Sequence, residues 1–276
     1  MSSVLGDPRQ GLHEHVFQGG NFFMQLMLNR YRNDLDVAAL PQELTNAADA
    51  TLTFLRSQSA RIELRNVEIS AGSLQADVFV KNLTGHKLPT AYPSRRAWLH
   101  FAVHDRDGKI VFESGALHPD GSIEGNDNDA DPTRYEPHYR EITSDDQVQI
   151  YEPILKDSEG RVTTGLLAAI GYLKDNRLLP TGFDKQSAEK DIAVIGDALD
   201  DPNFIAGSDL VHYSISFGGA EGPFRIEAEL LYEPIGFRWA HNLEPYRVSE
   251  PQRFVGYYES MASTAATVLA RAEVTK

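Results

Sequence analysis

The stretch GHKLPTAYPSRRAW, residues 85–98, lies between two runs in which apolar and polar residues alternate. The run before it is Leu74–Val80, and the run after it is Trp98–His104. Because successive side chains of a strand point to opposite faces, this alternation predicts two half-buried β-strands. The stretch between them is therefore a connection, stiffened by two prolines. A connection of this kind either binds a ligand or holds a difficult crossing between strands in place.

Further short strands are predicted along the chain by the same alternation. They cover residues 62–69, with a bulge at Asn66, and residues 110–113, 148–151, 210–217 and 224–232. Residues 105–108, Asp-Arg-Asp-Gly, and the glycine-rich residues 218–222 each fit a hairpin turn. Because the strands are short and lack regular helices between them, the sequence predicts a mainly β protein. The expected fold is an antiparallel immunoglobulin-like β-sandwich with long loops and flanking N- and C-terminal helices.

Helical spacing is concentrated at the two ends of the chain. Asn21 fits the N-cap of a helix over residues 21–31, and Pro41 fits the first turn of a helix that ends near residue 58. A last helix is predicted over about residues 252–271. We therefore divide the chain into an N-terminal arm with two helices (1–60), a β-sandwich domain with long insertions (61–240) and a C-terminal helix that packs back on the domain (241–276).

Composition excludes several classes of function. The formal net charge is −14 at pH 7, and a field of that sign repels phosphate backbones, so nucleic acid is not an expected partner. The sequence has no cysteine, which excludes disulfides, thiolate metal sites, thiol nucleophiles and covalent c-type haem attachment within this chain. No apolar run of about 18 residues predicts a membrane span. The first ten residues, MSSVLGDPRQ, show no secretory signal.

The connecting stretch supplies the first candidate site, which consists of His86, Arg95 and Arg96. Adjacent residues of an extended segment point to opposite faces, so one arginine can reach solvent while the other lies beneath the sheet. A buried guanidinium needs carboxylate or carbonyl partners, for which Glu152 and Asp175 are candidates. The site is either a structural clamp between the connection and the sheet or an anion-binding site.

A run of alternating carboxylates supplies a candidate metal site. Asp127, Asp129 and Asp131 are spaced like the first ligands of a calcium loop. An EF-hand is excluded, because Pro132 stands where that loop has glycine and His138 where it has glutamate. Two alternatives remain open, a looser calcium site and a plain acidic loop.

Several segments together resemble one protein family. They are HVFQGGNFFMQLML, NLTGHKLPTAYPSRRAWLHFAVHDRDGKIVFESG, QIYEPILKD, YLKDNRLLPTGFDK and AELLYEPI. In this order, over about residues 12–240, they resemble the haem-free C-terminal region of extracytoplasmic multihaem c-type cytochromes of the cytochrome c-552/c-554 type. The resemblance implies a periplasmic or extracellular setting and a multihaem c-type cytochrome domain or subunit as partner. In such relatives the haem-bearing part carries Cys-x-x-Cys-His motifs, which this chain lacks.

The resemblance also limits the roles that the chain can take. Electron transfer in that family belongs to the haems, so haem reaches this chain only if a partner supplies it. In the relatives, the segment that matches the surroundings of His15 follows the haem motifs. The resemblance therefore implies that His15 is a distal ligand to a haem held by the partner.

Two functions remain open. The first is a non-catalytic structural and interaction module of a multihaem cytochrome electron-transfer system. The second is a β-sandwich protein that binds a small ligand or a metal through His86, Arg95, Arg96 and residues 127–131. An enzyme that uses the same residues belongs to this second alternative. A pocket shared by His86, an arginine and a carboxylate favours the second function. An arginine buried with its donors paired to protein favours the first.

Overall fold

The computed structural model describes residues 19–70, 72–90 and 92–276. Its first two helices are α1 (Phe22–Arg30) and α2 (Pro41–Gln58). The Asn21 side chain accepts a hydrogen bond from the Met24 N–H at 3.0 Å and caps α1. Pro41 opens α2, where the Glu43 carboxylate accepts from the Leu40 N–H at 2.8 Å. Both N-terminal helices are therefore confirmed.

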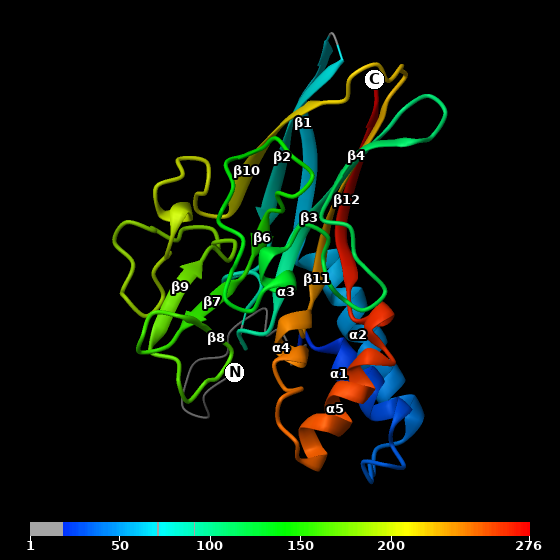
Figure 1. Cartoon of the computed structure of the whole chain (residues 1–276), viewed down its shortest axis with the longest axis vertical. Helices are drawn as coiled ribbons and strands as arrows, with labels where there is room; N and C mark the ends of the chain where they lie inside the picture. The colour runs from blue at the N-terminus through cyan, green and yellow to red at the C-terminus, as the bar shows by residue number, and fades with distance from the viewer. Residues whose placement is uncertain (1–18, 71, 91) are drawn as a thin grey trace, which may run out of the picture.

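Twelve strands of the described residues form three sheets (Figure 1). The first sheet has the order β1 (Ala60–Ser70), β2 (Ser73–Asn82), β10 (Ser208–Ser216), β5 (Glu141–Ile142). The second has the order β12 (Thr267–Thr275), β11 (Arg225–Glu233), β3 (Arg96–His104), β4 (Ile110–Ser114), with β6 (Ile150–Tyr151) also paired to β3. The third has the order β8 (Val162–Thr163), β7 (Pro153–Lys156), β9 (Gly171–Asp175). Neighbouring strands are antiparallel except β10 and β5, which are parallel.

The first and second sheets bury one hydrophobic core between them. Leu74, Ala76, Val78 and Val80 face it from β2, and alternate residues of β10, β3 and β11 face it from the other strands. Phe101 of β3 and Tyr213 of β10 stack across the interface with ring centroids 4.0 Å apart. The mainly β, sandwich-like architecture follows from this packing, while the immunoglobulin-like type stays a prediction.

The stretch 85–98 joins the two core sheets. It leaves β2 in the first sheet and enters β3 in the second. Residues 217–224 make the same change of sheet, because β10 pairs with β2 whereas β11 pairs with β3 and β12. The hairpin predicted at residues 218–222 is therefore wrong, since alternation reveals a strand but not its partner. The hairpin at residues 105–108 is confirmed by the pairing of β3 with β4.

Local irregularity in β1 also matches the sequence. The register against β2 shifts between Arg65 and Glu68, and Asn66 between them has φ +48°. This is the bulge predicted at Asn66, a residue type that tolerates the left-handed region.

The C-terminal part differs from the helix predicted over residues 252–271. Helix α4 (Phe237–His241) and helix α5 (Ser249–Glu259) precede the strand β12. Residues 267–270 of β12 are buried or half-buried, and from Arg271 onward exposed and half-buried residues alternate along the edge of β11. Backbone pairing with that edge outweighs the helical spacing of the apolar residues, and four β-branched residues suit the strand. The division into 1–60, 61–240 and 241–276 stays a prediction.

The two ends of the chain contribute to the central core. Phe22 and Met27 of α1, Leu55 of α2 and Tyr258 of α5 belong to the same cluster as the sheet residues. Helices α1, α2, α4 and α5 gather at one end of the sandwich (Figure 1). Helix α3 (Asp127–Ala130) lies beside the strands, in the long connection between β4 and β5, residues 115–140, which we call the excursion. Among the helices of the described ranges, none has both the length and the apolar character that crossing a membrane requires.

Candidate functional site

Arg96, the last arginine of the connecting stretch, is buried at the start of β3, with 4% of its surface exposed. Its Nε donates to Glu233 Oε2 at 2.8 Å. Its Nη1 donates to both carboxylate oxygens of Asp129 at 2.8 and 2.9 Å, and its Nη2 donates to the Gly121 carbonyl at 2.9 Å. Each nitrogen of the guanidinium therefore has a protein acceptor. We call Arg96, Asp129 and Glu233 the Arg96 cluster.

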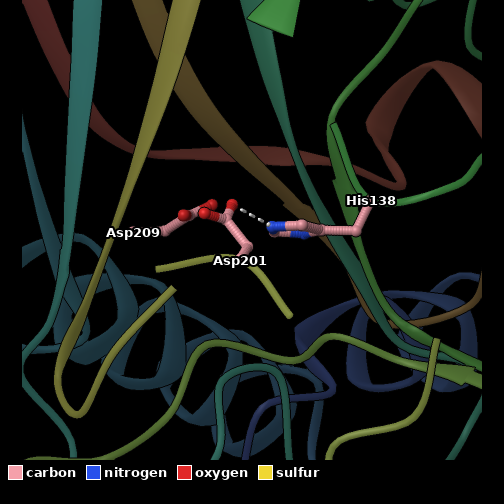
Figure 2. Close-up of side chains that lie close together, drawn as sticks. All are labelled: His138, Asp201 and Asp209. Atoms are coloured by element: carbon pink, nitrogen blue, oxygen red, sulfur yellow. Dashed lines mark hydrogen bonds and ion pairs between the residues drawn. The ribbon is translucent and has the colours of Figure 1, made fainter. Parts of the chain in front are cut away.

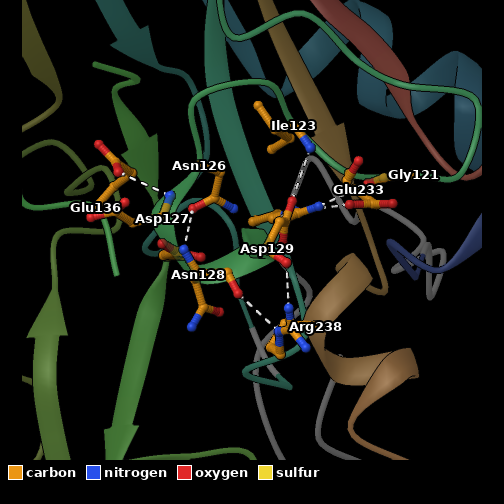
Figure 3. A network of polar contacts seen from close by, with 12 residues as sticks. Gly121, Ile123, Asn126, Asp127, Asn128, Asp129, Glu136, Glu233 and Arg238 are labelled. Carbon is orange, nitrogen blue, oxygen red and sulfur yellow. Dashed lines mark hydrogen bonds and ion pairs between the residues drawn. The ribbon is translucent and has the colours of Figure 1, made fainter. Parts of the chain in front are cut away.

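Asp129 brings the long excursion onto the sheet. It belongs to α3, and its Oδ2 also accepts from the Ile123 N–H at 2.9 Å (Figure 3). Arg238 of α4 holds the same turn, because its guanidinium donates to the main-chain carbonyls of Asn128, at 2.8 Å, and Asp129. One buried cluster thus connects the stretch 85–98, the second sheet, α3 and α4.

Burial controls the electrostatics of the Arg96 cluster. It raises the pKa of Glu233 to about 7, because removal from water outweighs the attraction of Arg96 and the charge of Asp129 adds to the rise. Burial alone would lower the pKa of Arg96, but its two carboxylates raise it above the usual value. Tyr258 of α5 donates its hydroxyl to Glu233 Oε1 at 3.2 Å. The cluster is thus arranged to join elements rather than to receive a ligand.

The partners expected for the buried arginine are wrong. Glu152 pairs with Lys174 at 3.2 Å. Asp175 pairs with Lys87 at 2.8 Å and with Arg177 at 2.7 Å. Asp129 was a candidate only for a calcium site or a plain acidic loop, and no pattern indicated Glu233, whose place opposite Arg96 depends on the register of β3 and β11.

The carboxylates of the predicted calcium loop have separate partners. Asp127 pairs with Arg134 at 2.5 Å, Asp129 belongs to the Arg96 cluster, and Asp131 Oδ1 accepts from the Thr133 N–H at 2.8 Å. Residues two apart on a helical turn do not face each other, so α3 separates side chains that an extended loop would bring together. A calcium site at these three residues stays a prediction without support from the arrangement.

His86 and Arg95 lie away from the Arg96 cluster. His86 is exposed, and its Nδ1 lies 3.0 Å from the Lys87 carbonyl. Arg95 is half-buried and donates from Nη1 to the Thr90 carbonyl at 3.3 Å. Both line a mostly apolar cavity of about 270 Å³, whose described lining contains no carboxylate. The pocket expected of a ligand site, shared by His86, an arginine and a carboxylate, is therefore present only in part: the carboxylate is missing from the described lining. His15 lies outside the described residues, and its role as a haem ligand stays a prediction.

A second buried polar cluster, which sequence analysis missed, surrounds His138 (Figure 2). Its Nε2 lies 3.1 Å from Asp201 Oδ2, and its Nδ1 lies 2.8 Å from Gln149 Nε2 and 3.1 Å from Asn176 Nδ2. Asp209 is next to them and accepts from Gln149 Nε2 at 3.3 Å. The five residues come from separate segments, so no spacing in the sequence indicated them. We call them the His138 cluster.

Main-chain contacts determine which nitrogen of His138 carries the proton. Gln149 Oε1 accepts from the Tyr139 N–H at 2.8 Å, and Asn176 Oδ1 accepts from the Glu152 N–H at 3.0 Å. The amide groups of both side chains therefore direct their NH₂ toward Nδ1, which must act as the acceptor. The proton of the neutral ring is then on Nε2 and is donated to Asp201.

This tautomer bears on metal binding by the His138 cluster. Single ligand atoms of His138, Asp201 and Asp209 lie within 4.8 Å of one another, as a metal site requires. A metal at Nε2 needs the lone pair there and the ring proton on Nδ1, opposite to the observed hydrogen bonds. Burial raises the pKa of Asp209, which also accepts from the Tyr151 hydroxyl at 2.7 Å. The arrangement favours a hydrogen-bond network over a metal centre.

A large cleft opens between residues 118–130, residues 134–147 and α4. Its volume is about 660 Å³. Among the described residues, six carboxylates line it: Asp120, Glu124, Asp127, Asp129, Glu136 and Asp146. The basic or titratable nitrogen side chains of this described lining are His118 and Arg134. We call this the acidic cleft.

Comparisons with known proteins give one distant structural similarity. No family model matches the sequence, and no curated protein matches it significantly. A penta-heme cytochrome c552 from Thermochromatium tepidum is similar in structure, with a TM-score of 0.47 and 17% sequence identity. The similarity covers 81% of this chain and 41% of that chain, so this chain spans less than half the length of that protein.

Proposed function

We propose that the chain is a non-catalytic structural and interaction module that works beside a multihaem c-type cytochrome in an extracytoplasmic electron-transfer system. The partner is proposed from the resemblance of the five segments within residues 12–240. Without a cysteine the chain attaches no c-type haem, so redox chemistry belongs to the partner.

The burial of Arg96, with its guanidinium paired to protein acceptors, is the observation that supports the non-catalytic role. It lies near the end of the stretch 85–98, the most specific part of the resemblance, and each of its guanidinium nitrogens donates to a protein acceptor. An arginine that binds substrate needs donors directed into an accessible site. Arg96 instead holds the excursion that contains Gly121 and Asp129 to the second sheet, which gives a partner a rigid surface to bind.

The test is a tagged form of the intact chain, produced in the cells that make it and recovered with its bound proteins from the extracytoplasmic fraction. We expect a retained protein with covalent haem, identified by its pyridine haemochrome spectrum and by Cys-x-x-Cys-His peptides in mass spectrometry. An unrelated tagged protein of similar negative charge is the control. Absence of a haem protein, or equal retention by the control, contradicts the proposal.

The cavity lined by His86 and Arg95 favours a second candidate function, binding of a small anion with an apolar body. Arg95 supplies the positive charge, and Phe54, Leu88 and Tyr232 belong to the walls. Small aromatic carboxylates should then raise the melting temperature of the wild type and leave that of Arg95→Ala unchanged. Equal shifts in both proteins count against this function.

A further inference from the structure

We propose that the acidic cleft binds a basic peptide segment, with lysine or arginine side chains at Glu136 and Asp146 and a main-chain carbonyl at Asn126. The inference rests on the proposed function and deepens it, because it names the chemistry by which a partner is held. A volume of about 660 Å³ lies within the range of ligand sites.

The cleft holds more negative charge than its own cations neutralise. Asp129 pairs with Arg96 and Asp127 with Arg134, and Glu124 is hydrogen-bonded to the His118 ring. The remaining three carboxylates, at Asp120, Glu136 and Asp146, make no ion pair with any residue that the structure describes. A cationic ligand is therefore favoured by charge complementarity.

Glu136 is the deepest of these three carboxylates, with only 2% of its surface exposed. Its Oε1 accepts from the Asp127 N–H at 3.1 Å, and its Oε2 accepts from the Tyr139 hydroxyl at 2.7 Å. Burial, together with the charge of Asp127, raises its pKa. A cation that enters the cleft stabilises the ionised form of a group that burial otherwise destabilises.

Asn126 supplies a separate indication of a ligand. It is 3% exposed, and its Oδ1 accepts from the Asn128 N–H at 3.1 Å, which fixes the orientation of the amide (Figure 3). Its buried Nδ2 then has no acceptor among the described residues, although Asn126 lines the cleft. A buried donor without a partner is unfavourable, and a ligand oxygen satisfies it.

These features together select the class of ligand. No three carboxylate or histidine side chains of the described cleft lining have ligand atoms within 4.8 Å of one another, which disfavours a single metal ion. A polyamine has positive charges but no oxygen for Asn126. A basic peptide has cationic side chains and carbonyl oxygens several ångströms apart, as the cleft requires.

The experiment measures binding of a fluorescent acetyl-Gly-Lys-Gly-Lys-Gly-amide peptide to the full chain by anisotropy at low salt. We expect saturable binding that weakens as salt is added. Glu136→Gln and the exposed Asp146→Asn should each raise the dissociation constant at least about fivefold. Glu159→Gln removes the same charge outside the cleft and should change binding less than about twofold. Absence of binding, or an equal effect of Glu159→Gln, overturns the inference.

Asn126→Asp separates the carbonyl contact from charge. The variant keeps an oxygen to cap α3 but loses the donor and adds a negative charge. We expect weaker binding of the peptide together with unchanged or stronger binding of spermine. If both ligands bind more tightly, the cleft recognises charge alone and the peptide assignment is wrong. No cytochrome is present in this assay, so its outcome is independent of whether the haem-protein partner is found.

Discussion

The outer face of the β3–β11 pair carries two acid–base pairs in different surroundings. Arg96 lies opposite Glu233, and four residues further along β3 His100 lies opposite Glu229. The first pair is covered by the excursion and by α3, whereas the His100 side chain remains 24% exposed. The same cross-strand pairing therefore occurs once in a fully buried site and once in a half-buried one.

From this difference we expect burial, more than the pairing itself, to determine how much each pair contributes to stability. Removal of one member of a buried ion pair leaves an uncompensated charge and costs about 3–5 kcal/mol. An exposed pair contributes about 0–1 kcal/mol, because water solvates each member almost as well. Substitutions at both ends of this face should therefore differ in their effect on stability.

The largest effect is expected for Arg96→Ala. It leaves Asp129 and Glu233 buried without their cation, so the free energy of unfolding should fall by about 3–5 kcal/mol. The melting temperature followed by circular dichroism should fall by about 10 °C. Arg95→Ala, at the adjacent half-buried residue, is the matched control and should change it by less than about 2 °C. An unchanged melting temperature of Arg96→Ala contradicts the structural role.

Asp129→Asn should have the second largest effect. An asparagine places an NH₂ group where one carboxylate oxygen of Asp129 accepts from Arg96 Nη1, and it removes the negative charge beside the buried guanidinium. We expect a loss of about 1–3 kcal/mol in urea unfolding. Asp131→Asn, at the half-buried C-cap residue of α3 in the same excursion, provides the comparison and should lose less. Equal losses would mean that burial of Asp129 adds nothing.

Glu233→Gln should have a smaller effect that depends on pH. The folded state raises the pKa of Glu233 from 4.5 to about 7, so the folded protein holds a proton that the unfolded chain has lost. The contribution of Glu233 to stability therefore falls as the pH rises from about 4.5 to about 7. Relative to wild type, Glu233→Gln should gain stability between pH 5.5 and pH 8 in urea titrations. A relative loss over this range contradicts the sign of the shift.

His100→Gln should have the smallest effect. Burial opposes protonation, but hydrogen bonds to Glu229 and Glu113 raise the pKa of His100 above 6.5. The hydrogen bond from His100 in turn lowers the pKa of Glu229 below 4.5. The stabilisation is therefore fully present between about pH 4.5 and 6.5 and is lost as the pH rises through the folded pKa of His100. The variant should lose less than about 1 kcal/mol at pH 5.5 and almost nothing at pH 8.5.

Features set by neighbouring residues were predicted well from the sequence. The Asn21 cap, the first turn at Pro41 and the bulge at Asn66 depend on local backbone geometry, and the structure contains all three. The change of sheet at residues 217–224 and the strand β12 were not predicted, because each depends on which edge is free to pair.

The candidate site was predicted only in part for the same reason. One buried arginine in the pair at 95 and 96 was expected, and Arg96 is buried. Its partners Asp129 and Glu233 lie 33 and 137 residues further along the chain, and only the strand register and the path of the excursion bring them together. The His138 cluster gave no signal, because its members lie on separate segments.

A double-mutant cycle between Arg96 and Asp129 tests the central claim most directly. The free energies of unfolding of wild type, Arg96→Met, Asp129→Asn and the double variant are measured in urea under the same conditions. If the two side chains form a buried ion pair that holds the excursion to the sheet, the coupling energy should exceed about 1.5 kcal/mol. A coupling energy below about 0.5 kcal/mol would show that the contact does not hold these elements together.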